Sequence, residues 1–152
     1  MSIIAKQELD IRIKRAVEQI SKQKIITAFL LFGSYAVGRP TPLSDIDFAV
    51  LLDEPIEYDR LFEEKMHLLG TLTEIFQTDN LDLVVLNEAP VGLAYSAMRD
   101  GKLLYIRNSE TNKFVSFKAK AIDRYFDYRP VQNYFSAALG RRIKEGSYAG
   151  GQ

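Results

Sequence analysis

Two segments decide the fold of this chain: Leu30-Leu31-Phe32-Gly33-Ser34-Tyr35 and, with ten residues between Ser34 and Asp45, Asp45-Ile46-Asp47-Phe48. Residues 24–32 are rich in β-branched and aromatic side chains, and the run suits a buried strand but is too short for a membrane helix. Gly33 ends this strand, and the Ser34 hydroxyl can cap a short helical turn in the connector that follows. The two segments therefore predict two strands joined by a Gly-Ser turn and a short helical connector.

The second predicted strand carries two acidic side chains. Side chains alternate along a strand, so Asp45 and Asp47 are predicted to project from one face while their apolar neighbours point into a core. Adjacent carboxylates repel each other unless a cation lies between them, and oxygen ligands of this kind suit Mg²⁺ or Mn²⁺. A third acid, Asp82, opens the later apolar run 81–86. A Gly-Ser pair or an Asp-x-Asp pair alone is typical of ordinary turns, but their combination is far more specific.

These motifs resemble the signature of the polymerase-β-like nucleotidyltransferases. The similarity extends over nearly the whole chain, including residues 42–47 and 125–130, to the minimal nucleotidyltransferase (MNT) family, the antitoxin half of HEPN–MNT toxin–antitoxin pairs. The family often has Gly-Ser-x-Ala-Arg-Gly, and this chain has Val37 in place of that arginine. Arg39, two residues later, is the candidate replacement for the missing cation.

The resemblance implies an α/β (α+β) fold, with a mixed sheet flanked by helices and a C-terminal helical appendage. It also implies an enzyme that transfers AMP from ATP to a tyrosine hydroxyl of a partner HEPN ribonuclease toxin, with release of pyrophosphate and formation of a hetero-oligomer. Two Mg²⁺ ions (Mn²⁺ is possible) would act in this reaction. The residues that it implies are the catalytic and metal-binding Asp45, Asp47 and Asp82, and the nucleotide-binding Gly33, Ser34 and Arg39.

The composition is that of an ordinary globular domain, 47% hydrophobic and 26% charged over 152 residues. The formal net charge of +0 argues against broad nucleic-acid binding, and no sequence-specific binding is expected. The charge is nevertheless uneven, because residues 1–110 carry 12 basic and 17 acidic side chains while residues 111–152 carry 8 and 3. This basic end is either an ordinary helix surface or a surface that meets phosphate or an acidic partner.

Localisation is predicted from what the sequence lacks. There is no cysteine, no apolar run that approaches the ~20 residues of a membrane span, and no signal-peptide pattern at the start. A cytoplasmic protein without membrane contact is expected. A single domain is predicted over residues 1–145, with a core at about 1–107, the appendage at about 108–145, and a flexible Gly-rich tail at 146–152.

Helical and strand periodicities predict the remaining elements. The helix at about 58–77 has Asp59 as its candidate N-cap, and the only histidine, His67, on its surface or half-buried. Its core-facing residues are predicted to be Phe62, Met66, Leu69 and Phe76, joined by Leu61, Leu68, Leu72 and Ile75. Asp53 and Glu54 are expected to be solvated loop acids. Other helices are expected at 6–22, 90–100, 109–128 and 131–145, the last two separated by Arg129-Pro130, and strands at 81–86 and 102–107.

Three other functions fit parts of the pattern. A small-molecule nucleotidyltransferase of the aminoglycoside type usually needs an acidic pocket, whereas the region beyond the core is basic. A non-catalytic antitoxin that covers its toxin would be consistent with Val37, although it would leave the clustered carboxylates without a purpose. A general nucleic-acid polymerase is disfavoured by the chain's size and zero net charge. The aromatic and basic end is either a docking surface or the appendage's own core; its residues are Tyr125, Phe126, Tyr128, Arg129, Tyr134, Phe135, Arg141 and Arg142.

Overall fold

The computed structural model describes the backbone of residues 3–144 and the side chains of residues 3–128. The predicted flexible tail at 146–152, and the aromatic and basic side chains from residue 129 onward, lie outside the described part. Within it, four strands form one mixed sheet in the order β3-β2-β1-β4. The strands are β1 Ile26–Phe32, β2 Ile46–Leu52, β3 Leu81–Val85 and β4 Lys102–Ile106.

Strand β1 is antiparallel to β2 and to β4, and β2 is parallel to β3. Every residue of β1 is buried because the strand lies inside the sheet and helices cover both of its faces. The predicted weak edge strand is confirmed as β4, whose outer residues are exposed. The mixed α/β architecture agrees with the predicted fold class.

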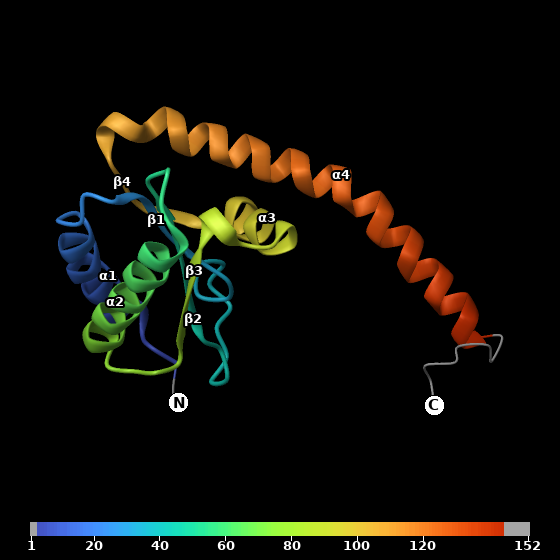
Figure 1. Ribbon diagram of the computed structural model, residues 1–152. Helices are drawn as coiled ribbons and strands as arrows, with labels where there is room; N and C mark the ends of the chain where they lie inside the picture. The colour runs from blue at the N-terminus through green and yellow to red at the C-terminus, as the bar shows by residue number, and fades with distance from the viewer. Residues whose placement is uncertain (1–2, 145–152) are drawn as a thin grey trace.

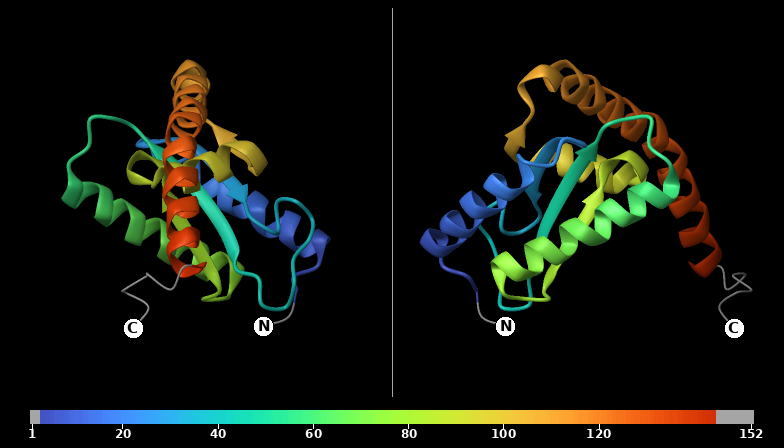
Figure 2. Two further views of the ribbon diagram at one scale, coloured as in Figure 1. Left: turned by 90° about the vertical axis from the view of Figure 1, so that its right-hand side faces the viewer. Right: turned by 60° about the vertical axis from the view of Figure 1, so that its left-hand side comes forward.

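Two helices cover each face of the sheet (Figures 1 and 2). Helices α1 Lys6–Ile20 and α2 Tyr58–Phe76 pack on one face. The core on this face includes a buried aromatic group, in which the ring centroid of Phe48 lies 5.2 Å from those of both Phe29 and Phe76. Helix α3 Val91–Asp100 and the first half of α4 Thr111–Lys144 pack on the other. Short 3₁₀ turns, Leu86–Glu88 and Asn108–Glu110, precede α3 and α4.

The C-terminal helical region differs from its prediction. A single helix, α4, runs from Thr111 to Lys144 through Pro130, where two separate helices were expected. A proline inside a helix removes one backbone hydrogen bond and bends the helix, and it does not always end it. Figure 1 shows α4 following the body along its first half and then curving away from it.

Helix α2 also differs from its prediction in two details. Its N-cap residue is Glu57 instead of Asp59, and no side chain caps it. Phe62 and Met66, predicted to face the core, are 54% and 47% exposed. The buried residues are Leu61, Leu68, Leu72 and Phe76, which were also predicted to face the core. The predicted core-facing set was therefore too wide, and the position of the sheet decides which of its members are buried.

None of the helices in the described part of the chain combines the length and apolar character that a bilayer crossing needs.

Candidate active site

Asp47 and Asp82 lie side by side on neighbouring parallel strands. Asp47 is the second residue of β2, Asp82 is the second residue of β3, and the two are directly paired in the strand register. Adjacent strands are about 4.8 Å apart, so the two side chains leave the same face of the sheet at nearly the same point. Their neighbours Phe48 and Leu83 point to the opposite face and are buried in its core. This pairing confirms that the later acid joins the earlier ones in space.

The Gly33 turn closes against Asp47. Gly33 follows β1 directly, and its φ of 74° is a left-handed conformation that glycine adopts without strain. A Cβ atom at this position would overlap Oδ2 of Asp47. Glycine is therefore required both by the turn and by the approach of the carboxylate. The result is a half-buried turn whose backbone lies beside an acid, which suits a phosphate group bound through a cation.

Asp47 is held in an environment that disfavours its charge. Burial, followed in size by the negative charges of Asp82 and Asp45, together raise its pKa from 3.8 to about 6. Asp45 was predicted to lie on the second strand, but it is exposed and lies immediately before β2, which begins at Ile46. Asp82 is exposed at the edge of the sheet. The three carboxylates thus form one electrostatic cluster with Asp47 as its inner member.

The donor set suits a hard divalent cation. Carboxylate oxygens are the ligands that Mg²⁺ and Mn²⁺ prefer, and a cation at this cluster would relieve the repulsion that raises the Asp47 pKa. Among the described residues, however, the side chains as they stand do not bring three acidic, His or Cys groups together closely enough to form a metal centre. The cluster therefore fits a metal ion by its chemistry, with rotation of the exposed Asp45 and Asp82 side chains needed to complete the ligand set.

The connector after Gly33 is a series of turns, where a short helix was predicted. The amides of Ala36 and Val37 donate to the Gly33 carbonyl at 3.1 and 3.3 Å, and the Arg39 amide donates to the Ser34 carbonyl at 2.9 Å. These bonds close single turns without continuing into a helix. The Ser34 hydroxyl makes no hydrogen bond to another described residue, so it is available to a ligand.

The two residues that distinguish this loop from the family pattern are both accessible. Val37 is 50% exposed, and Arg39 is exposed with no ion pair to any described side chain. Arg39 therefore remains the candidate cation of the loop.

Thr41 and Ser44 form a hydrogen-bonded turn that the sequence analysis did not predict. The Thr41 amide donates to the Ser44 hydroxyl at 2.8 Å, and the Ser44 amide donates back to the Thr41 carbonyl at 2.9 Å. This turn immediately precedes Asp45 and fixes the approach of the chain to β2. A Ser or Thr at each end of a proline-containing tetrapeptide is the sequence feature that could have predicted it.

The structure tests two further predictions, those for His67 and Asp53. His67 is exposed on α2, as predicted. Asp53, predicted to be a solvated loop acid, instead accepts hydrogen bonds at 2.5 Å from Thr27 and at 2.5 Å from Arg107. Arg107 lies 54 positions away in the sequence, so local pattern could not have shown this pair.

A mixed sheet with paired carboxylates at the start of two parallel strands, beside a Gly-Ser turn, is the arrangement of a polymerase-β-like nucleotidyltransferase core. The family described as "Polymerase beta, Nucleotidyltransferase" matches residues 14–110 of this chain. The chain belongs to this family.

A protein adenylyltransferase is among the relatives of this chain. The protein adenylyltransferase MntA of Aphanizomenon flos-aquae (strain 2012/KM1/D3) is 39% identical over 93 residues, which are 57% of this chain and 61% of that protein. The chain thus matches less than two thirds of this relative's length.

Solved structures share the fold. A chain of a toxin–antitoxin crystal structure with AMP-PNP is 23% identical with a TM-score of 0.58, over 89% of this chain and 95% of that one. A chain from tri-AMPylated Shewanella oneidensis HEPN toxin in complex with MNT antitoxin is 22% identical with a TM-score of 0.52, over 88% and 97%.

Proposed function

We propose that this chain is a metal-dependent protein adenylyltransferase that acts as an antitoxin. It transfers AMP from ATP to a tyrosine hydroxyl of a partner HEPN ribonuclease toxin and releases pyrophosphate. The observation that carries the proposal is the in-register pairing of Asp47 with Asp82 beside the close-packed Gly33 turn. Membership of the nucleotidyltransferase family and the likeness to an MntA protein support the activity and the antitoxin role.

The Gly33 turn and Ser34 hold the nucleotide phosphates. The free Ser34 hydroxyl donates to a phosphate oxygen, and the open backbone at Gly33 lets the triphosphate approach the acids. Arg39 contributes a positive charge from the outer end of the loop. Together these contacts place the α-phosphate over the carboxylates and hold the pyrophosphate as it leaves.

Asp45, Asp47 and Asp82 would hold the Mg²⁺ ions, which neutralise the phosphate charge and activate the attacking oxygen. The acceptor's tyrosine oxygen forms a bond to the α-phosphorus, and the bond from that phosphorus to the bridging oxygen breaks, so that pyrophosphate leaves with the electron pair. Asp82 lies exposed on the edge strand, where an incoming protein chain has direct access, and it receives the tyrosine proton.

We place the acceptor on a separate protein, the HEPN toxin, and α4 is the described element beyond the core that could meet it. In its described part, α4 exposes Val115, Phe126 and Tyr128, while Tyr125 stacks on Tyr95 of α3 with ring centroids 3.8 Å apart. The aromatic residues of this region thus divide between the appendage's own packing and an accessible surface. That surface is the proposed docking site for the toxin.

The deciding experiment is intact mass spectrometry of the HEPN protein co-expressed with, or encoded beside, this chain. It is incubated with the chain, Mg²⁺ and each nucleoside triphosphate in turn. We expect a mass gain of one or more AMP units with ATP, located on tyrosine by fragmentation, and none with an Asp45→Ala, Asp47→Ala double variant. No mass gain in the presence of a tight complex would overturn the enzymatic proposal.

That last outcome would favour a non-catalytic antitoxin. The exposed Val37, which leaves the phosphate loop one cation short of the family pattern, is the observation in its favour. An experiment in cells distinguishes the two proposals, because a non-catalytic antitoxin would still neutralise the toxin when Asp45 and Asp47 are replaced.

A further inference from the structure

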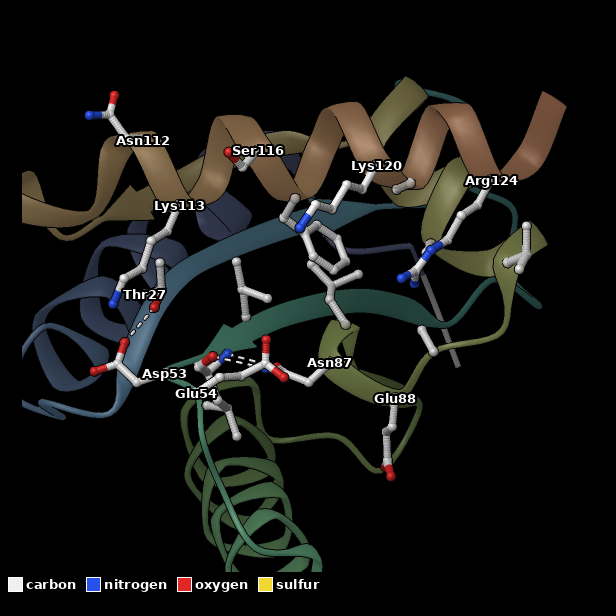
Figure 3. A pocket seen from close by; sticks show the side chains of 18 residues that line it. Thr27, Asp53, Glu54, Asn87, Glu88, Asn112, Lys113, Ser116, Lys120 and Arg124 are labelled. Atoms are coloured by element: carbon white, nitrogen blue, oxygen red, sulfur yellow. Dashed lines mark hydrogen bonds between the residues drawn. The ribbon is translucent and has the colours of Figure 1, made fainter. Parts of the chain in front are cut away.

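A second site lies at the other end of the sheet from the acids. A cavity of about 800 Å³ opens between α4 and the ends of β2 and β3 (Figure 3). Leu51 lines it, and this residue leaves β2 on the same face as Asp47 but four positions later, roughly 13 Å along the strand. None of the three candidate catalytic acids lines the cavity. Its volume is in the range of small-molecule sites.

Two cations from α4 form the roof of this cavity. Lys120 and Arg124 lie one helical turn apart, and Figure 3 shows both side chains extending from α4 toward the cavity. Neither makes an ion pair or hydrogen bond with another described residue, whereas Lys113 on the same helix is paired with Glu110 at 2.9 Å. Like charges at this spacing repel each other. An anion between them would remove that repulsion.

Three acids line the cavity, and none of them forms an ion pair with Lys120 or Arg124. Asp53 is occupied by Thr27 and Arg107, at 2.5 Å each. Glu88 points away from α4 (Figure 3), and Glu54 is an exposed acid just beyond the end of β2. Neither cation of the roof is therefore neutralised by direct pairing.

Apolar side chains line part of the cavity, both on α4 and on the elements opposite it. Leu51 and Leu86 come from the sheet and its 3₁₀ turn, Ala94 comes from α3, and the ring of Phe117 comes from α4. Leu51, Leu86 and Ala94 are buried, and Phe117 is partly buried. A ligand that fills this space thus needs an apolar body as well as a negatively charged group.

We propose that this cavity binds a phosphorylated small molecule with a flat apolar ring, of the class of nucleoside monophosphates. The phosphate lies between Lys120 and Arg124, where a dianion matches two positive charges and the planar guanidinium can donate two parallel hydrogen bonds. The ring lies against Leu51, Leu86 and Phe117. This site is distinct from the nucleotide site of the proposed transfer reaction and does not depend on that reaction.

The test uses NMR spectra of the full chain, with labelled amides and leucine methyl groups, in the presence of a metal chelator. The chelator prevents metal-assisted binding at the acid cluster. AMP is the probe, and adenosine and inorganic phosphate are its two halves. We expect AMP to shift the signals of Leu51 and Leu86, and each half alone to bind at least about tenfold more weakly than AMP.

A second test reverses the charges of Lys120 and Arg124. The Lys120→Glu, Arg124→Glu double variant should weaken AMP binding at least about tenfold, because two charge-assisted contacts are lost. Lys118→Glu is the matched control, since Lys118 is exposed on the same helix but does not line the cavity, and it should change the affinity less than about twofold. The replaced side chains are all exposed, so the fold is expected to persist, and the amide spectrum verifies it.

Any one of five results would overturn the proposal. AMP shifts confined to the region of Gly33 and Asp47 would place the ligand at the acid cluster. Affinity unchanged in the double variant, or adenosine binding as tightly as AMP, would remove Lys120 and Arg124 as the phosphate site. Absence of any shift at millimolar AMP, or phosphate binding as tightly as AMP, would exclude this ligand class.

Discussion

Two aspartates at opposite ends of β2 have opposite environments. At the start of the strand, burial and the neighbouring charges of Asp82 and Asp45 raise the pKa of Asp47 to about 6. Just beyond the end of the strand, burial also acts to raise the pKa of Asp53, but hydrogen bonds from Thr27 and Arg107 outweigh it and the pKa is lowered. The same side chain on the same sheet is therefore destabilised in one place and stabilised in the other.

The difference separates a functional carboxylate from a structural one. Asp53 accepts hydrogen bonds from Thr27 of β1 and from Arg107, which follows β4. Arg107 also donates to the backbone carbonyls of Lys24 and Ile26, so the group links β1 to the segment after β4. Asp47 makes no such contribution, and its ionised form is held against electrostatic repulsion. Groups of this second kind concentrate at sites where a ligand supplies the missing charge. The contrast predicts that one aspartate controls activity and the other controls stability.

The largest effect is expected for Asp47→Asn. The variant keeps the size of the side chain but removes the charge of the inner member of the cluster, so AMP transfer should fall at least about 100-fold. Transfer is measured by intact mass of the toxin, with Glu54→Gln, an exposed acid near the far end of the strand, as the control. Wild-type rates in the Asp47 variant would show that the cluster is not the catalytic centre.

Gly33→Ala should affect both properties. Its methyl group would overlap the Asp47 carboxylate, and the left-handed φ of 74° adds strain for any residue other than glycine. We expect a loss of about 2 kcal/mol in unfolding free energy and a loss of activity of tenfold or more. Urea denaturation and transfer assays measure the two. Gly38→Ala is the matched control, since Gly38 has a similar φ of 73° but open space around it, so only the strain should remain.

Asp53→Ala should reduce stability while sparing chemistry. It leaves the hydroxyl of Thr27, which is 1% exposed, without its carboxylate partner, and we expect a loss of about 2 kcal/mol. Since the folded-state pKa is lowered, this contribution is present above the ordinary pKa of 3.8 and is lost as the pH falls through the lower folded value. Denaturation at pH 7 should therefore distinguish the variant from wild type, and the difference should shrink as the pH is lowered below 3.8. A pH-independent difference would contradict the assignment.

Without metal, Asp47→Asn should be more stable than wild type at neutral pH. A raised folded-state pKa means that the wild type loses stability as the pH rises from 3.8 toward about 6, and the neutral amide avoids that loss. The full shift corresponds to about 3 kcal/mol, and solvent screening at this partly exposed group reduces the expected gain to about 1 kcal/mol. Denaturation in chelator at pH 4 and pH 7.5 measures it. Added Mg²⁺ should stabilise the wild type more than the variant, and equal stabilisation would argue against a metal at this carboxylate.

The acid cluster was predictable because its information is local. Alternation along one strand places the Asp47 side chain opposite to Phe48, and a second Asp before an apolar run places Asp82 on a comparable strand. The Asp53–Arg107 pair was not predictable, because it joins residues 54 positions apart that meet only through the order of the strands. The same limit explains α2, where both Leu61 and Phe62 were predicted to face the core and only the position of the sheet decides that Leu61 is buried and Phe62 exposed.

The prediction of two separate C-terminal helices was wrong for a different reason. Pro130 was expected to stop a helix, because a proline disfavours helical conformation in the residue before it. That rule describes a local preference, and α4 continues through the proline to Lys144. The cavity beneath α4 was equally beyond sequence reasoning, because Lys120 and Arg124 meet Leu51 and Leu86 only after the helix has folded back over the sheet.

The smallest predicted effect concerns the loop beside the acids, and it sharpens the contrast between the two ends of β2 by adding charge at the functional one. Val37→Arg restores the cation of the family pattern at a position that is 50% exposed, so the fold should tolerate it. If the loop holds the triphosphate, the KM for ATP should fall about threefold at low salt, and the gain should shrink as salt screens the added charge. Val37→Gln, similar in size to a truncated arginine but uncharged, is the control. An equal change in both variants would assign the effect to side-chain length, whereas a change only in kcat would show that the loop acts after the nucleotide has bound.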